Sequence, residues 1–144
     1  MRLIALVLIL IAPNWVVAQK MDEKAKLSDI SPLYIELVDN ATNGCWTNLM
    51  EAKSYAAGQI DIAGGKVVET AQEASSVFTI NVHAGRMNEV QCLGSVQVSI
   101  YRPYRYDGVI TLALYSQHLR TAVQPNFNNF ALDVIKEAVQ KWKE

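Results

Sequence analysis

The sequence predicts an α+β protein built as a two-layer, open-faced sandwich, in which two helices cover one face of a mostly antiparallel sheet. Three observations support this fold class. Residues 43–69 carry apolar side chains three or four positions apart and then Gly64-Gly65, the pattern of a helix that ends at a glycine cap before a strand. Residues 77–119 alternate apolar and polar side chains in three runs, which is typical of strands with one buried face. A second helical stripe occupies residues 127–142, so the expected order is β-α-β-β-β-β-α.

The first eighteen residues are predicted to be a secretory signal peptide. Arg2 supplies a positive start, and residues 3–12 form an unbroken apolar run. The small residues Val16 and Ala18 then precede an expected cleavage before Gln19. We therefore expect a periplasmic or secreted protein.

A transmembrane anchor is the alternative interpretation of this first segment. The apolar run is far shorter than the roughly 20 residues that span a bilayer, and Pro13 interrupts its end. Cleavage would leave a flexible leader over residues 19–31, a single α+β domain over residues 32–144, and no transmembrane segment.

The first strand and the first helix follow each other closely. Residues 33–38 alternate apolar and polar side chains and are predicted to form the strand. The helix begins near residues 44–48, where Asn48 and Glu51 have the spacing of a capping box; Asn43 as a cap one turn earlier is the alternative. Its apolar face consists of Cys45, Leu49, Ala52, Ala56, Ile60 and Ala63. Residues 66–69 form the second strand.

The remaining three strands are predicted to form an antiparallel meander. Residues 77–84 and 92–102 each have one apolar and one polar face, and Pro103 is expected to end the latter strand. The turn signal Asp107-Gly108 then leads into a returning strand over residues 109–119.

Residues Asn126–Asn129 are predicted to cap a closing helix that runs to about Lys143. Glu137 and Lys141 are four positions apart, and we expect them to form an exposed ion pair on it. Its apolar stripe consists of Phe127, Phe130, Ala131, Val134, Ala138 and Trp142.

The only two cysteines, Cys45 and Cys92, are predicted to form a disulfide. Cys45 belongs to the apolar stripe of the helix, and Cys92 is in phase with the apolar face of a strand, so both side chains should point into the same core. An even number of cysteines in an exported protein favours this pairing. Two buried free thiols are the alternative.

Charge and composition exclude several classes of partner. Without residues 1–18, which contain one arginine, the chain has 12 basic and 14 acidic residues, a net charge of about −2. Nucleic acid as a partner would require a basic patch, and adsorption to a membrane would require a polybasic face, so neither is expected. The oligomeric state is left open by the sequence.

No catalytic or metal-binding motif is recognised, so we expect a non-enzymatic protein without a cofactor. His83 and His118 are the only histidines, and the strand alternation places them on opposite faces of the sheet. A metal site needs three or four converging ligands, and a hydrolase of the serine type would need a nucleophile elbow, which the sequence does not contain.

A segment rich in tyrosine and arginine, residues 101–108, is the most suggestive local feature. Both residue types are favoured at recognition surfaces. In the binding hypothesis, Arg102 and Arg105 hold an anionic or glycan group while Tyr104 and Tyr106 stack on it. In the alternative hypothesis, the tyrosines cover the sheet edge and the arginines only increase solubility.

The strand sequences carry a resemblance at the level of topology. A strand ending in Asp-Asn-Ala-Thr, an amphipathic helix, a Gly-Gly turn into Val-Val, and long strands Val-Phe-Thr-Ile-Asn-Val and Val-Gln-Val-Ser-Ile-Tyr follow one another. This pattern, over residues 33–142, resembles the amino-terminal domain of TolB and the LptE-type envelope assembly proteins, and also small exported proteins of Proteobacteria. The resemblance implies a non-enzymatic periplasmic or outer-membrane component that docks on partners.

The sequence therefore supports an exported protein that binds a protein or envelope component, or assists envelope assembly. A secreted inhibitor of a hydrolase such as lysozyme or a protease, with the loop 101–107 as a plug, is the first alternative. A small hydrolase with an unrecognised site is the second.

Overall fold

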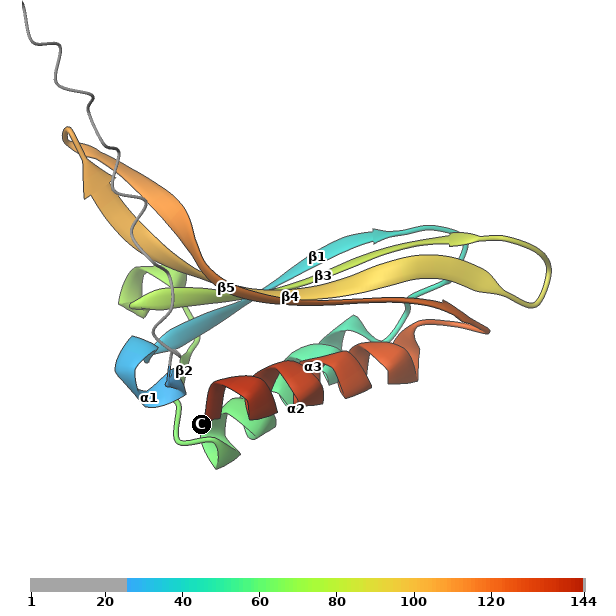
Figure 1. Cartoon of the computed structure of the whole chain (residues 1–144), viewed down its shortest axis with the longest axis horizontal. Helices are drawn as coiled ribbons and strands as arrows, with labels where there is room; N and C mark the ends of the chain where they lie inside the picture. The colour runs from blue at the N-terminus through green and yellow to red at the C-terminus, as the bar shows by residue number, and fades with distance from the viewer. Residues whose placement is uncertain (1–25, 144) are drawn as a thin grey trace, which may run out of the picture.

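The protein folds as a five-stranded sheet with two long helices packed under one face (Figure 1). The computed structural model describes residues 26–143, except the side chain of Tyr106. The predicted signal peptide, residues 1–18, and most of the predicted leader lie outside the described residues. The elements in chain order are α1 (Leu27–Ile30), β1 (Leu33–Ala41), α2 (Leu49–Ile62), β2 (Val67–Val68), the 3₁₀ turn η1 (Ala71–Glu73), β3 (Ser76–Arg86), β4 (Cys92–Tyr106), β5 (Val109–Gln124) and α3 (Asn128–Lys143).

The strand order β2-β1-β3-β4-β5 combines a parallel and an antiparallel part. Strand β1 is parallel to both β2 and β3, whereas β3, β4 and β5 form an antiparallel meander that makes up most of the paired length. Helix α2 packs against β1 and β2, and α3 packs against β4, β5 and α2. The predicted α+β class and the predicted order of strands and long helices are confirmed.

The short helix α1 occupies residues that the sequence analysis placed in the flexible leader. Leu27 and Ile30 are buried, because α1 packs directly against the core. The hydroxyl of Ser31 donates a hydrogen bond to the Leu27 carbonyl at 2.7 Å and accepts one from the Lys66 backbone N–H at 3.0 Å. These bonds connect the start of the domain to Lys66, directly before β2. The sequence pattern of the leader does not indicate this contact.

The core lies between one face of the sheet and the two helices. Phe78, on β3, meets Trp142, on α3, edge to face with ring centroids 6.0 Å apart. The other buried sheet residues come mainly from alternate positions of β3 and β4, as the alternation predicts: Ile80, Val82, Val96, Val98 and Ile100. The helices contribute small or branched residues such as Ala56, Ile60, Val134 and Ala138, which let them approach the sheet closely.

The predicted disulfide between Cys45 and Cys92 is confirmed. Both residues are fully buried, but Cys45 lies in the loop before α2 and not on the helix, because α2 begins only at Leu49. The backbone N–H of Phe127 donates to the Cys45 carbonyl at 2.6 Å, which also ties this loop to the start of α3. A disulfide of this kind is typical of an oxidising, extracytoplasmic compartment.

None of the helices among residues 26–143 is long and apolar enough to span a membrane.

Candidate interaction surface

Strands β4 and β5 continue beyond the sheet as a projecting two-stranded hairpin. The pairing between β3 and β4 ends at Val77 and Tyr101, whereas β4 and β5 stay paired as far as Tyr106 and Val109. Figure 1 shows this hairpin bending away from the layer of helices. Its turn is Asp107-Gly108, where both residues have positive φ, +48° and +80°, as a two-residue turn matching the strand twist requires.

The prediction that Pro103 ends β4 is wrong. Pro103 pairs with Leu112 in the middle of the projecting hairpin, and β4 runs on to Tyr106. Proline lacks a backbone N–H, and it is tolerated here because, among the described residues, β4 has a neighbouring strand on one side only beyond Tyr101. The tyrosine- and arginine-rich segment is therefore a strand and not a loop.

A bulge at Tyr115 sets which side chains share each face of the hairpin. Ile100 pairs with Ser116, but Tyr101 pairs with Leu114, so Tyr115 is the extra residue. The alternation of β5 is shifted by one residue at this point. Sequence alternation had put His118 in phase with Leu114, and the bulge places them on opposite faces.

The four predicted binding residues are distributed over both faces of the hairpin. Arg102 and Tyr104 share one face, whereas Arg105 lies on the other, because adjacent strand positions point to opposite sides. Tyr106 closes β4, and its side chain lies outside the described residues. The structure therefore does not bring Arg102 and Arg105 together on one face, while all three described side chains are exposed.

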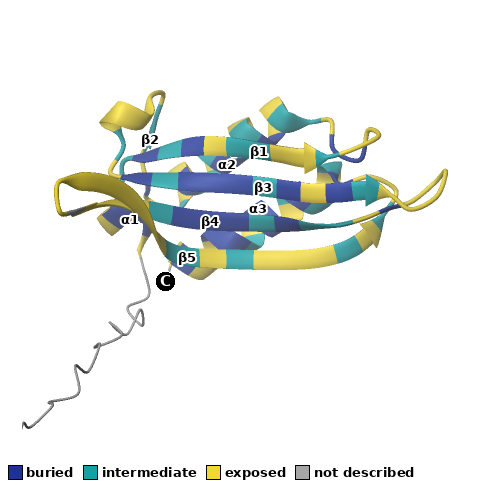
Figure 2. Ribbon diagram, turned by 90° about the horizontal axis from the view of Figure 1, so that it is seen from above, coloured by how far each residue is buried: buried dark blue, intermediate teal, exposed yellow. Residues whose placement is uncertain are grey.

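The face that carries Arg105 also carries an exposed apolar row, which we call the hairpin apolar face: Ile110, Leu112 and Leu114. Their side chains are 63%, 53% and 38% exposed. Figure 2 shows the projecting part of the hairpin as exposed along its length. Contiguous exposed apolar side chains of this kind mark interaction sites more often than isolated ones do. The sequence does not reveal this row, because an uninterrupted alternation would have placed these three side chains over the core.

The base of the hairpin is held by contacts to the domain. The Arg102 guanidinium lies 5.4 Å from the centre of the Tyr115 ring, which packs against the core. The Trp142 indole N–H donates to the Ser116 hydroxyl at 2.8 Å. These two contacts hold the base of the hairpin against the domain, while the rest of the hairpin is exposed.

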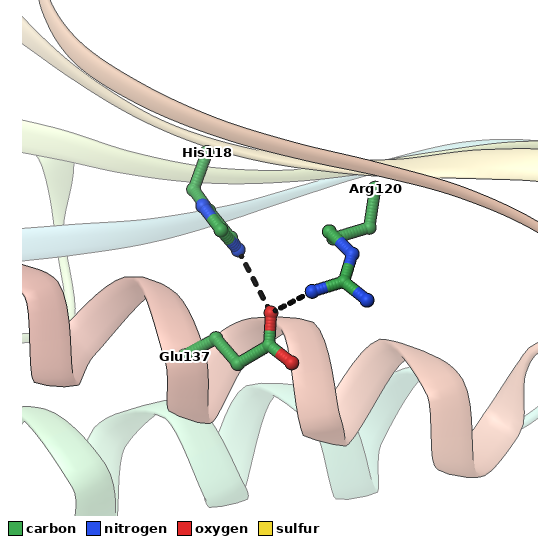
Figure 3. A network of polar contacts seen from close by, with 3 residues as sticks. All are labelled: His118, Arg120 and Glu137. Carbon is green, nitrogen blue, oxygen red and sulfur yellow. Dashed lines mark hydrogen bonds and ion pairs between the residues drawn. The ribbon is translucent and has the colours of Figure 1, made fainter.

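Further along β5, an ion-pair cluster joins the strand to α3 (Figure 3). One carboxylate oxygen of Glu137 lies 3.1 Å from His118 Nε2 and 2.8 Å from Arg120 Nη1. The expected Glu137–Lys141 pair is not formed, and these two contacts are the only ion pairs among residues 26–143. An i,i+4 pair on a helix surface contributes only about 0.3–0.5 kcal/mol, so the Arg120 guanidinium and the His118 ring, both from β5, compete well for the same carboxylate.

The two histidines lie apart, as the alternation predicts. His83 is exposed on the open face of the sheet, and His118 faces α3. Within the described part of the chain, no three His, Cys, Asp or Glu side chains are grouped so as to hold a metal ion.

Comparisons with known proteins identify neighbours in structure but none in sequence. Neither a protein-family model nor a curated protein matches the sequence. Two solved structures of PelC dodecamers from Paraburkholderia phytofirmans are similar, one of them a single-substitution variant. Their TM-scores are 0.52 and 0.50 at 14% identity, and the alignments cover 84% of this chain and 94% and 91% of those chains. At this identity, the comparison shows that the protein shares a fold with the PelC subunit.

Proposed function

We propose that this protein is exported to the periplasm or secreted, and that it works without catalysis as a self-associating binding protein in envelope assembly. In this proposal, the hairpin apolar face contacts the partner component. The observation that carries the proposal is the exposed row Ile110, Leu112 and Leu114 on a projecting, well-anchored hairpin.

Export is supported by two independent features. The first eighteen residues have the pattern of a cleavable signal peptide. The Cys45–Cys92 disulfide fits the oxidising environment that such a signal leads to.

Binding through the hairpin is supported by the apolar area that it leaves in contact with water. Full burial of a leucine or isoleucine stabilises a complex by about 1.5–3 kcal/mol relative to leaving it exposed. Ile110 and Leu112 are 63% and 53% exposed, so covering the pair would contribute roughly 2–4 kcal/mol before the costs of association. Arg105 beside this row adds a planar donor at the same surface.

Self-association is supported by the fold neighbours, which are dodecamers of PelC. The topological resemblance to the amino-terminal domain of TolB and to LptE-type proteins supports the other part of the proposal, a component that docks on partner proteins.

The inhibitor hypothesis is a second candidate, and the shape of the hairpin favours it. A narrow two-stranded projection with Tyr104 and Arg105 near its tip has a form that can enter an enzyme cleft. Inhibition of a lysozyme or protease that is lost in Arg105→Ala would support this reading. No effect on any enzyme tested would count against it.

Site-specific crosslinking in the exported protein tests the main proposal. A photoreactive residue replaces Leu112 on the hairpin or, as the matched control, the exposed Gln72 of η1. We expect a discrete crosslinked envelope component from position 112 only, and its loss when Ile110→Ser is added. Crosslinking that is equal at both positions, or unchanged by Ile110→Ser, would refute a binding role for the hairpin.

A further inference from the structure

Charge is divided between the two sides of the sheet. On the side of β1, residues 33–73 contain six carboxylates and two lysines, a formal charge of −4. All six carboxylates are exposed. We call these carboxylates the acidic side: Glu36, Asp39, Glu51, Asp61, Glu69 and Glu73.

The opposite side of the sheet is basic. Residues 92–143, which form β4, β5 and α3, contain six arginines and lysines and three carboxylates, a formal charge of +3. All six cations are exposed. We call these cations the basic side: Arg102, Arg105, Arg120, Lys136, Lys141 and Lys143.

The topology is what separates these charges in space. Strand β5 is at one edge of the sheet, β2 and β1 are at the other, and each long helix lies under its own half (Figure 2). Within residues 26–143, only Arg120 among these twelve side chains forms an ion pair. One copy of the chain therefore leaves nearly all of this charge unpaired.

Both edges also present unpaired strand. Among the described residues, β5 has β4 on one side and no strand on the other. Strand β1 is paired with β2 only at Leu33 and Tyr34, so in the part of the chain that the structure describes its outer edge is open from Ile35 to Ala41. Open strand edges are templates for pairing with another chain.

From this arrangement we infer that copies of this chain associate head to tail, with the basic side of one copy against the acidic side of the next. This inference rests on the proposed self-association and adds the surfaces that make it. A two-fold contact between β5 edges would bring the basic sides of two copies together, which like-charge repulsion disfavours. The head-to-tail contact opposes cations and carboxylates, and it repeats from copy to copy until the ring closes or a filament forms.

Reciprocal charge reversal tests the inference in the mature chain. Variant A carries Glu36→Lys and Glu69→Lys on the acidic side. Variant B carries Arg105→Glu and Lys141→Glu on the basic side, and neither of these cations has a hydrogen-bond or ion-pair partner among the described residues. The matched control is Glu89→Lys, an exposed carboxylate in the β3–β4 connection, away from both sides.

We expect sedimentation velocity at low salt to show wild type and control associating equally. Variants A and B alone should each associate at least about tenfold more weakly. An equimolar mixture of A and B should associate again, because the lysines introduced in A can then face the glutamates introduced in B, while the unaltered sides of the two variants still oppose each other. Association should also weaken as salt shortens the screening length from about 10 Å at 0.1 M to about 3 Å at 1 M.

The outcomes separate this inference from the proposal beneath it. Wild type that stays monomeric at all concentrations would overturn the proposed self-association and the head-to-tail contact together. Wild type that associates while A is unaffected, or a mixture of A and B that does not recover, would overturn the head-to-tail contact alone. Circular dichroism of each variant, with a spectrum equal to wild type, ensures that lost association is not lost folding.

Discussion

Replacing both cysteines, Cys45→Ala with Cys92→Ala, is expected to remove about 4 kcal/mol from the free energy of unfolding. The bond closes a loop with a sequence separation of 47 residues. In the chain-entropy description, a crosslink over such a loop restricts the unfolded chain by about 13–14 cal/mol/K, which is about 4 kcal/mol at 25 °C. Both sulfur atoms are fully buried, so their removal also lowers packing in the native state.

Such a loss is large relative to the total stability of about 5–15 kcal/mol that is typical of small domains. For a domain of this size, it corresponds to a decrease in Tm of roughly 12–20 °C. Urea unfolding followed by tryptophan fluorescence measures it directly, since Trp46 and Trp142 are both buried in the core. The intact mass with and without reductant checks beforehand that wild type contains the bond and lacks residues 1–18.

Reductant provides the internal control for this prediction. It should lower the urea midpoint of wild type and leave the midpoint of the alanine variant unchanged. A difference in unfolding free energy below about 1 kcal/mol, between wild type and variant, would refute the argument that this loop closure stabilises the domain.

Two further substitutions test close packing, one between neighbouring strands of the sheet and one between the sheet and α3. Gly94→Ala should lower stability by about 1–3 kcal/mol or more, because an added Cβ would lie 2.6 Å from the Ala84 Cα on the neighbouring strand. Gly58→Ala in α2 is the matched control, since its Cβ meets nothing within 4 Å and should stabilise the helix by about 0.5–1 kcal/mol. Chemical denaturation of both variants measures the two changes in unfolding free energy. Equal effects of the two substitutions would contradict the packing argument. Trp142→Phe should cost about 1–3 kcal/mol through the lost hydrogen bond to Ser116 and the lost ring volume. Adding Ser116→Ala to it should cost little more, and full additivity in thermal unfolding would show that this bond does not contribute.

Local pattern determined most of the architecture of this protein. Alternation in residues 77–84 and 92–100 is enough to define two strands and their buried faces. Successive side chains of a strand point to opposite faces, so only one orientation of each strand turns all of its apolar side chains towards the core. The same reasoning predicted the Cys45–Cys92 bond, since it requires only that both residues point into one core. These features depend on neighbours in sequence or on a single shared core, and both can be read along the chain.

The tertiary structure decided the features that depend on a particular neighbour. Pro103 continues β4 because no strand within residues 26–143 lies beside it on one side, and only the strand order shows this. The bulge at Tyr115 turns Ile110, Leu112 and Leu114 away from the core face, and nothing in their alternation marks the shift. Glu137 contacts His118 and Arg120 of β5 in place of its helix neighbour Lys141, because the fold brings β5 and α3 together.

The distribution of charge shows most clearly what the sequence determines and what only the fold determines. The sequence alone contains an acidic stretch, residues 33–73, and a basic stretch, residues 92–143, but the whole chain is close to neutral and predicts no partner. The fold places β2 and β1 on one side of the sheet and β5 at the opposite edge, so the two stretches become two separate surfaces of opposite sign. Net charge is a property of composition, whereas the field at a surface depends on where the folded chain holds each charge.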